Sequence, residues 1–367
     1  MNTVLRVVLY ALLMIVVLGV LIFIHELGHF ITARRFGVTV NEFALGMGPT
    51  LFSKKSKKHG TKYSLRLFPI GGFVSMVGED EASDDENAFC NKKVWKRMII
   101  VVAGATMNLI LGFLLIAILV IAQPQMGSNV YAGTIDQTKL DALVENNPDI
   151  FKNYNFDEIP LESGDKIISV GGTRVFTYND VSYELMQKGN EPVEVVVKRD
   201  GQKVLLTVTL PQITDEASNS SFGYMGFMKF FEEEKTVLNV IKHTASRSVS
   251  SVKMVYDSLI GLFSGRFGIE AVSGPIGVAE AVGSAAETGY LNLIYIVAVL
   301  TINLGVVNLM PFPALDGGRF LLLIVEGIRK KPLNRNVETY INLTGMVILF
   351  AFMIFISFKD VIKLIFR

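Results

Sequence analysis

The stretch Phe23-Ile24-His25-Glu26-Leu27-Gly28-His29-Phe30 lies inside a long apolar run near the N-terminus. On a helix His25 and His29 share one face, because they are four residues apart, and their two imidazoles can hold one zinc ion. Glu26 lies beside them, where a carboxylate can take a proton from an attacking water. Ionisable side chains within a bilayer are costly and by default mark a functional site. The motif therefore predicts zinc-dependent hydrolysis inside a membrane.

The composition predicts a mixed architecture. Half of the 367 residues are hydrophobic and 19% are charged, so the chain is too apolar for an ordinary soluble enzyme and too charged to be wholly embedded. The formal net charge of +1, without a basic patch interleaved with aromatics, argues against nucleic-acid binding. Cys90 is the single cysteine, which excludes an internal disulfide and a zinc site built from several thiolates.

Four segments are long and apolar enough to cross a hydrocarbon core, which takes about 20 residues. They are residues 7–33, which carry the histidine motif, 98–122, 291–309 and 340–358. The first apolar run is too long for a signal peptide, and no small-residue cleavage site follows it. We therefore expect an α-helical polytopic membrane protein with four transmembrane helices.

The distribution of Lys and Arg predicts the orientation, because cytoplasmic loops carry the excess of positive charge. The loop 34–97 is rich in Lys and Arg close to both flanking spans, and the connection between the third and fourth spans is basic as well. We expect both of these on the cytoplasmic side, with the two termini and residues 123–290 outside. Lys359, Lys363 and Arg367 at the C-terminus run against this rule.

The loop after the first span predicts a β-hairpin. Two short runs of strand character, 62–67 and 73–76, flank Phe68-Pro69-Ile70-Gly71-Gly72, and the apolarity of the segment suggests that it dips toward the membrane. An unpaired strand edge near the zinc could pair with a substrate in extended form, whereas the alternative is a purely structural hairpin. The residues expected to contact substrate here are Tyr63, Ser64, Leu65, Gly71, Gly72, Phe73 and Val74.

From about residue 128 to 211 the composition becomes that of a small soluble domain. We expect a strand between turns in 164–172, a short helix over 179–187, and two strands, 193–197 and 204–210, joined through Arg199-Asp200-Gly201-Gln202. Residues 235–263 have apolar side chains at helical spacing mixed with Lys and Arg. This pattern predicts a helix that lies on the outer membrane surface or bridges domains.

The third span ends in Asn308-Leu309-Met310-Pro311-Phe312-Pro313-Ala314-Leu315-Asp316-Gly317-Gly318. The two prolines end or kink the helix, which leaves Asp316 at the same membrane edge as His29. Catalytic zinc takes three protein ligands and a water, so the two histidines need a third partner, and a carboxylate is the expected type. Asp316 is the best candidate, and the alternative is an aspartate that caps a helix.

The second span contains Gly104-Ala105-Thr106-Met107-Asn108 within an otherwise aliphatic helix. Small residues permit close packing of membrane helices, and we expect Asn108 to form a hydrogen bond with a neighbouring helix. Taken together with His25–His29 and the 308–317 stretch, this segment makes the chain resemble the site-two proteases. These are intramembrane zinc metalloproteases, and within them the chain resembles the bacterial regulator-of-sigma-E protease type.

The resemblance implies one Zn²⁺ per chain, bound by His25, His29 and Asp316, with Glu26 as the catalytic residue. It also implies that Asn308 binds the substrate backbone, that the 63–76 hairpin is a membrane-re-entrant β-loop, and that an extracytoplasmic PDZ-like α+β domain is inserted between the spans. The expected location is the bacterial cytoplasmic (inner) membrane, with the active site near its cytoplasmic side. The implied substrate is a single-span membrane protein, such as an anti-sigma factor or a remnant signal peptide.

The expected domains are an N-terminal membrane part (1–127), the PDZ-like domain (128–212), an interfacial helical segment with connector (213–290) and a C-terminal membrane part (291–367). The approach to the Gly-Asp-x-Ile segment, 146–163, is longer and more polar than the family pattern, so peptide binding and size filtering by this domain both stay open. Two other functions stay open: a non-catalytic membrane scaffold that recruits extracytoplasmic partners through its PDZ-like domain, and a metal transporter. A transporter would need ionisable residues along a whole pathway.

Overall fold

The four predicted spans are helices. In the computed structural model, helices long and apolar enough to cross a membrane cover Leu5–Arg35, Val94–Ala122, Tyr290–Asn308 and Asn336–Ile362, so the predicted ends are correct to within four residues. Large apolar side chains stay exposed along the first and last of them, with Val16 62% and Ile354 66% exposed. Such exposure is unfavourable in water and suits contact with lipid chains.

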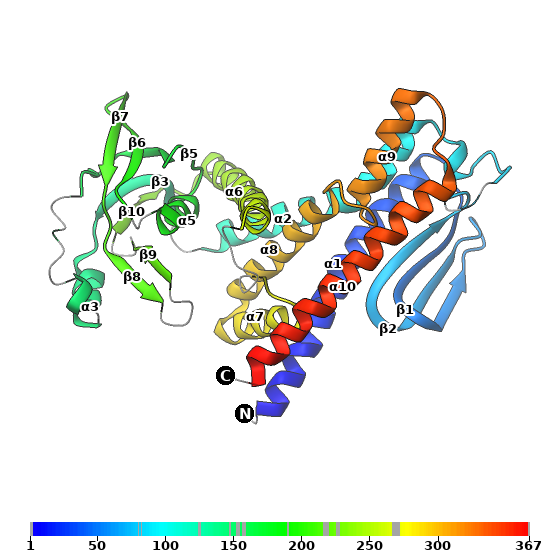
Figure 1. Ribbon diagram of the computed structural model, residues 1–367, viewed down its shortest axis with the longest axis horizontal. Coiled ribbons are helices and arrows are strands. Elements are labelled where there is room, and N and C mark those ends of the chain that lie inside the picture. The colour runs from blue at the N-terminus through cyan, green and yellow to red at the C-terminus, as the bar shows by residue number, and fades with distance from the viewer. Residues whose placement is uncertain are drawn as a thin grey trace. The chain divides into compact units, whose positions relative to one another are not determined.

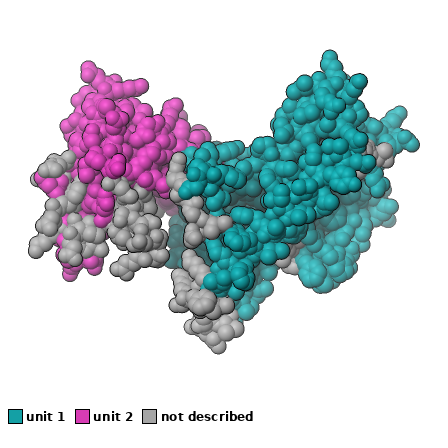
Figure 2. Space-filling view, viewed as in Figure 1, with its two compact units in different colours: residues 1–115, 255–367 teal, residues 116–254 magenta. Residues whose placement is uncertain are grey.

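The structure describes residues 3–79, 81, 83–123, 126–146, 148–151, 155, 159–188, 191–215, 220–224, 228–265 and 272–365. It is mostly helical and divides into two compact units, shown in Figure 2. Unit 1 comprises residues 1–115 and 255–367, and unit 2 comprises residues 116–254. The described parts of all four candidate spans lie wholly or largely in unit 1.

Unit 1 contains α1 (Thr3–Arg35), most of α2 (Val94–Ala122), α7 (Pro275–Thr288), α8 (Tyr290–Asn308), α9 (Asp316–Arg329) and α10 (Arg335–Ile365), with the short helix η1 (Phe89–Asn91) before α2. In Figure 1, α1 begins and α10 ends at the same end of the unit. This agrees with an even number of crossings between the two termini. Helix α9, between α8 and α10, is not predicted from the sequence.

Helices α2 and α8 pack closely because a glycine lies between them. A Cβ on Gly305 would lie 3.0 Å from the carbonyl oxygen of Ala105. The hydroxyl of Thr301 on α8 donates to the carbonyl oxygen of Asn108 at 3.2 Å. The expectation that small residues around 104–108 allow close helix packing is therefore confirmed.

The predicted hairpin within residues 62–76 is wrong in its pairing. Strand β2 (Lys62–Met76) pairs with β1 (Val40–Lys55) instead. Residues 42–45 of β1 have partners on both sides, since Leu45 lies opposite both Gly72 and Leu65. The two runs that look like hairpin arms are therefore separated by β1, which the sequence conceals because Gly46, Gly48 and Pro49 interrupt its strand character.

Unit 2 is built on a sheet with the order β10-β3-β4-β6-β7, with β5 paired to β4. Its strands are β3 (Met126–Ile135), β4 (Lys166–Val170), β5 (Thr173–Arg174), β6 (Val193–Arg199), β7 (Gln202–Val208) and β10 (Met228–Glu233). A second pair is formed by β8 (Gln212–Asp215) and β9 (Ser220–Gly223), and the helices are α3 (Gln137–Asn146), α4 (Pro148–Phe151), α5 (Tyr178–Lys188) and most of α6 (Val237–Phe263). The predicted strand at 164–172, the helix at 179–187 and the β6–β7 hairpin are confirmed.

The β6–β7 turn shows why this hairpin is predictable. Asp200 and Gly201 have φ angles of 49° and 85°, and two successive residues with positive φ match the right-handed twist of the strands that they join. Valines of β6 then alternate into the core, where Val195 and Val197 are buried beside Ile167 of β4.

A buried ion pair holds the start of β4 against the end of β6. The guanidinium of Arg199 donates to both carboxylate oxygens of Asp165, with Nε–Oδ1 at 2.8 Å and Nη2–Oδ2 at 2.7 Å. The side chain of Asp165 is only 1% exposed. Burial by itself would raise the pKa of Asp165, but the hydrogen bonds from Arg199 hold this pKa below its ordinary value.

We expect Arg199→Met to destabilise unit 2 at neutral pH, because it leaves the Asp165 carboxylate buried without its cation. A carboxyl group with a lowered folded-state pKa stabilises the fold above its unfolded pKa, and this contribution is lost as the pH falls through the folded pKa. The loss caused by the substitution should therefore shrink in acid. Amide hydrogen exchange of β4 and β6 in the full chain measures it, with Lys198→Met as the control. Equal protection in both variants at neutral pH would contradict this account.

Candidate metal centre

The structure brings together the three residues predicted to bind zinc. His25 and His29 project from one face of α1, and Asp316 is the first residue of α9. The Nε2 atom of His25 lies 3.2 Å from Asp316 Oδ2, and that of His29 lies 3.3 Å from the same oxygen. The two Nε2 atoms are 3.2 Å apart. Within the described part of the chain, these residues form the one group of three or more His, Cys, Asp or Glu side chains close enough to share a metal ion.

The spacing of these three atoms fits a tetrahedral zinc ion. Zinc–ligand distances of about 2.0–2.1 Å at the tetrahedral angle separate the ligand atoms by about 3.3 Å. Both histidines are buried, with 8% and 9% of their surface exposed. A buried carboxylate facing two imidazoles is costly unless a cation or protons occupy the space between them. The donor set, the spacing and the burial therefore all fit zinc.

Tight backbone turns hold Asp316 in this position. Ala314 has a positive φ of 71°, and its N–H donates to Asn342 Oδ1 at 3.4 Å. A Cβ on Gly317 would come closer than 3.0 Å to the carbonyl oxygen of Met310, and one on Gly318 would come equally close to that of Phe312. Only glycine fits at these two positions. The Leu-Asp-Gly-Gly sequence thus folds the start of α9 back against the end of α8.

Helix α2 forms the wall behind the two imidazoles. A Cβ on Gly28 of α1 would collide with the backbone of Ala103, so the two helices cross in backbone contact. A Cβ on Gly104 would lie 2.8 Å from His25 Nε2 and even closer to His29 Nε2. The absence of a side chain at Gly104 therefore creates the space in which the two ligand atoms face Asp316.

Glu26 lies next to strand β2. A Cβ on Gly72 would be 3.3 Å from Glu26 Cγ, so the backbone of β2 passes beside the candidate base. Gly72, Phe73 and Val74 have strand partners in β1 on one side only among the described residues. Their other edge is where an extended peptide could be added next to Glu26.

The remaining predicted substrate contacts are placed differently. The backbone of Tyr63, Ser64 and Leu65 is paired with two separate parts of β1, which leaves it no free edge. Both hydrogen-bonding edges of these three residues are occupied, so they offer no site for strand addition in this arrangement, and their contact with substrate stays a prediction. Gly71 has a positive φ of 87° at the bend that precedes the free edge.

Asn308 is the last residue of α8 and precedes the loop that carries Asp316. None of the hydrogen bonds found among the described residues joins it to His25, His29 or Asp316. A Cβ on Gly317 would also come closer than 3.0 Å to the carbonyl oxygen of Leu309, so the residue after Asn308 packs against the start of α9. The role of Asn308 in binding the substrate stays a prediction.

Two contacts from α2 are not predicted in detail from the sequence. The carbonyl oxygen of Ile100 lies 2.8 Å from His29 Nδ1, and the amide of Asn108 lies 3.2 Å from His25 Nδ1. The expected hydrogen bond from Asn108 to a neighbouring helix is thus confirmed, and its partner is a candidate metal ligand. The one hint in the sequence is a lone amide in an aliphatic helix.

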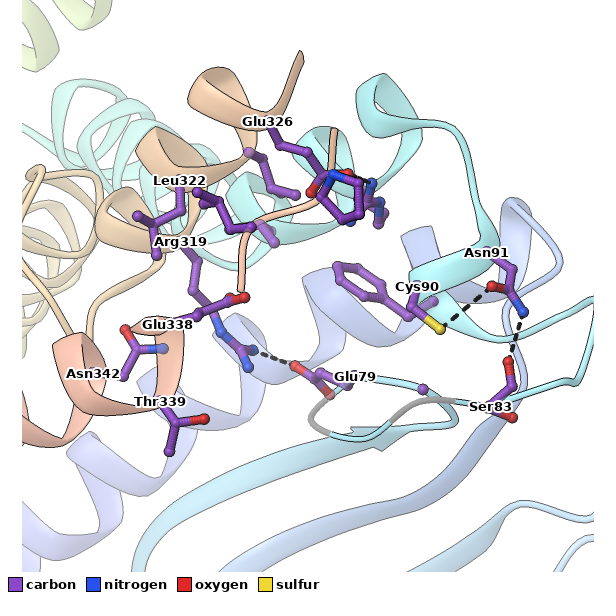
Figure 3. Close-up of a pocket in the computed structure, with 17 residues that line it drawn as sticks. Glu79, Ser83, Cys90, Asn91, Arg319, Leu322, Glu326, Glu338, Thr339 and Asn342 are labelled. Atoms are coloured by element: carbon purple, nitrogen blue, oxygen red, sulfur yellow. Dashed lines mark hydrogen bonds and ion pairs between the residues drawn. The ribbon is translucent and has the colours of Figure 1, made fainter. Parts of the chain in front are cut away.

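A cavity of about 400 Å³ lies apart from the three candidate ligands, between the end of β2, the start of α2 and helices α9 and α10 (Figure 3). Arg319, one turn after Asp316, forms an ion pair across it with Glu79. Arg97 of α2 forms a second, two-pronged pair with Glu326 of α9. The cavity does not include the candidate ligands, but its ion pairs fasten α9 to α2 and to the end of β2.

Two imidazoles and a carboxylate between apolar helices are typical of a metal-dependent hydrolase of the membrane. Residues 13–352 match the model of peptidase family M50, and the chain belongs to this family, which confirms its resemblance to the site-two proteases. It is 34% identical to a candidate zinc metalloprotease of Clostridium acetobutylicum, over 95% of this chain and 96% of that protein.

Two further relatives also match over nearly their whole length. A candidate zinc metalloprotease of Fusobacterium nucleatum is 34% identical, over 96% of this chain and 98% of that protein. The regulator of sigma-W protease RasP of Bacillus subtilis is 28% identical, over 95% of this chain and 97% of that protein. The protein is therefore a multi-pass membrane zinc metalloprotease, which removes the two non-proteolytic functions that the sequence left open.

We expect Gly104→Ala to abolish stoichiometric zinc binding, because the added methyl group would occupy the space in front of both Nε2 atoms. Zinc content of the purified protein measures the effect. Gly327→Ala is the matched control, since its Cβ would meet only Val94 Cγ1 at 3.6 Å, an ordinary contact. Thermal unfolding of both variants separates metal loss from misfolding. A folded Gly104→Ala protein with one zinc per chain would contradict the arrangement described here.

Proposed function

We propose that this protein hydrolyses a peptide bond within the transmembrane segment of a single-span membrane protein. The observation that carries the proposal is the convergence of His25, His29 and Asp316 to within 3.2–3.3 Å of one another. The histidines lie in a helix long and apolar enough to cross a membrane, so the bond to be cut must come to the bilayer. Membership of a zinc metalloprotease family supplies the reaction type.

His25, His29 and Asp316 would hold the metal ion. Zinc at this position supplies Lewis-acid polarisation of a peptide carbonyl and lowers the pKa of water toward neutrality. Glu26 acts as the general base that takes the proton of the attacking water, and afterwards returns it to the nitrogen of the leaving amine. The new carbon–oxygen bond forms first, and the carbon–nitrogen bond breaks afterwards, once the leaving nitrogen has been protonated, so one water is consumed for each bond cut.

The substrate has to be unwound before it is cut, because carbonyl groups in a helix are engaged in internal hydrogen bonds. We assign its extended form to the free edge of β2 at Gly71, Gly72, Phe73 and Val74, where strand addition would satisfy the exposed backbone. The position of Gly72 beside Glu26 supports this edge. Asn308 would also bind the substrate backbone.

The orientation that we propose puts the loop between α1 and α2 in the cytoplasm, on the strength of its Lys and Arg residues. We place the protein in the cytoplasmic membrane of a bacterium, since the similar proteins come from bacteria, and we assign unit 2 as an extracytoplasmic PDZ-like domain. Helix α6 exposes Val237, Leu238 and Ile241 on one side, which suits the outer membrane surface. One relative is named as a regulator of sigma-W protease, which supports an anti-sigma factor as substrate.

We expect Glu26→Gln to lower cleavage of a model transmembrane substrate by at least about 100-fold, since general-base catalysis contributes about 10²–10⁴-fold. Zinc content should be unchanged, because the three ligands remain. The assay uses the full chain in proteoliposomes with a tagged single-span substrate, and Glu280→Gln is the control for loss of an unrelated carboxylate. Undiminished cleavage by Glu26→Gln would remove this residue from the mechanism.

We also expect a photo-activated side chain at Phe73 to cross-link a substrate trapped on the Glu26→Gln protein, whereas one at Leu65 should not. Phe73 lies on the free edge of β2, while the backbone of Leu65 is paired on both sides. Mass spectrometry of the adduct locates the joined residues. Strong cross-linking from Leu65 alone would contradict binding of the substrate at the free edge of β2 near Glu26.

A further inference from the structure

One face of α2 provides the outer contacts of both imidazoles. Ile100, Gly104 and Asn108 are four residues apart and so line a single face of the helix. The carbonyl oxygen of Ile100 meets His29 Nδ1 at 2.8 Å, and the amide of Asn108 meets His25 Nδ1 at 3.2 Å. Gly104 lies between them and leaves room for the two Nε2 atoms. Each histidine therefore has one ring nitrogen facing Asp316 and the other facing α2.

An imidazole that uses Nε2 as a metal ligand carries its proton on Nδ1, so its outer partner must accept a hydrogen bond. The Ile100 carbonyl can only accept, which fixes the proton of His29. Asn108 can either donate or accept, because half a turn of its amide exchanges Oδ1 and Nδ2. With Nδ2 turned toward His25, Asn108 Oδ1 is buried and has no hydrogen-bond partner in the described structure.

We propose that Asn108 is a positioning residue whose side-chain oxygen accepts a hydrogen bond from Nδ1–H of His25, so that His25 Nε2 is presented to the metal ion. The inference rests on the proposed zinc chemistry. Asn108 is fully buried, and the hydroxyl of Thr301 donates to its backbone oxygen, so α8 holds this turn of α2 in place. Helices α2 and α8 thereby set the tautomer of a residue on α1.

Three variants test this role. Asn108→Leu keeps the approximate size of the side chain but removes the acceptor, and loss of an outer partner typically weakens metal binding by about 10–100-fold. Asn108→Asp keeps an acceptor in either orientation and has no N–H to donate. Thr106→Val is the control on the same helix, because the Thr106 side chain is exposed and, among the described residues, bonds only to Val102 O of its own helix.

The measurement is zinc affinity of the full chain by competition with a chelator, together with the ¹⁵N shifts of labelled histidine. We expect a 10–100-fold loss for Asn108→Leu, near-normal affinity for Asn108→Asp and no change for Thr106→Val, with the Nδ1–H signature of His25 lost only in the leucine variant. Normal affinity in Asn108→Leu, or an equal loss in Asn108→Asp, would overturn the proposal. If Asn108→Leu does not fold, Asn108→Ala replaces it, since alanine cannot overpack the site.

The readout keeps this inference separate from the proposed function. Zinc affinity does not depend on cleavage, and Glu26→Gln leaves the ligands in place. A loss of affinity in Asn108→Leu together with full activity of Glu26→Gln would retain the positioning role and reject the proposed mechanism. Normal zinc affinity in Asn108→Leu together with loss of cleavage in Glu26→Gln would reject the positioning role alone.

Discussion

The structure of the site depends on one constraint: the imidazoles of His25 and His29 and the carboxylate of Asp316 are largely buried together between apolar helices. Desolvating Asp316 beside His25 and His29 carries a free-energy penalty that packing alone does not remove, and a divalent cation offsets it best. The surrounding backbone is shaped to keep these groups together. Gly28 lets α1 and α2 touch, Gly104 leaves the ligand atoms their space, and Gly317 folds the start of α9 back on the loop before it.

Helix α2 contributes no candidate ligand, yet it determines how the ligands are presented. Its Ile100 carbonyl and Asn108 amide meet the outer nitrogens of His29 and His25, and Arg97 at its start joins Glu326 of α9. Arg319 of α9 forms an ion pair with Glu79, which lies just beyond the end of β2. Ion pairs therefore join α9, which begins with Asp316, both to α2 behind the histidines and to the end of β2, the strand beside Glu26. The candidate metal site and the proposed substrate edge are thus held by the same set of contacts.

The β-structure shows where sequence reasoning reaches its limit. Within unit 2, the dipeptide Asp200-Gly201 is typical of a hairpin turn with two positive φ angles, and both residues adopt them. The pairing of β6 with β7 is therefore predictable from neighbouring residues. In unit 1 the arms of the expected hairpin are separated by β1, because Leu45 pairs with both Gly72 and Leu65. No local pattern in residues 62–76 reveals that a strand from residues 40–55 lies between them.

The sequence by itself determined the four membrane helices, the His-Glu-x-x-His pattern and the likeness of the 308–317 stretch to a site-two protease, because hydrophobic length, helical spacing and ligand type are properties of short segments. Only the tertiary structure decided that Asp316 lies within 3.3 Å of both histidines, that Gly72 and not Tyr63 offers an open edge beside Glu26, and that Asn108 faces His25. These facts depend on how closely backbones distant in the chain approach one another. Such distances are set by packing across helices and are not encoded in any single segment.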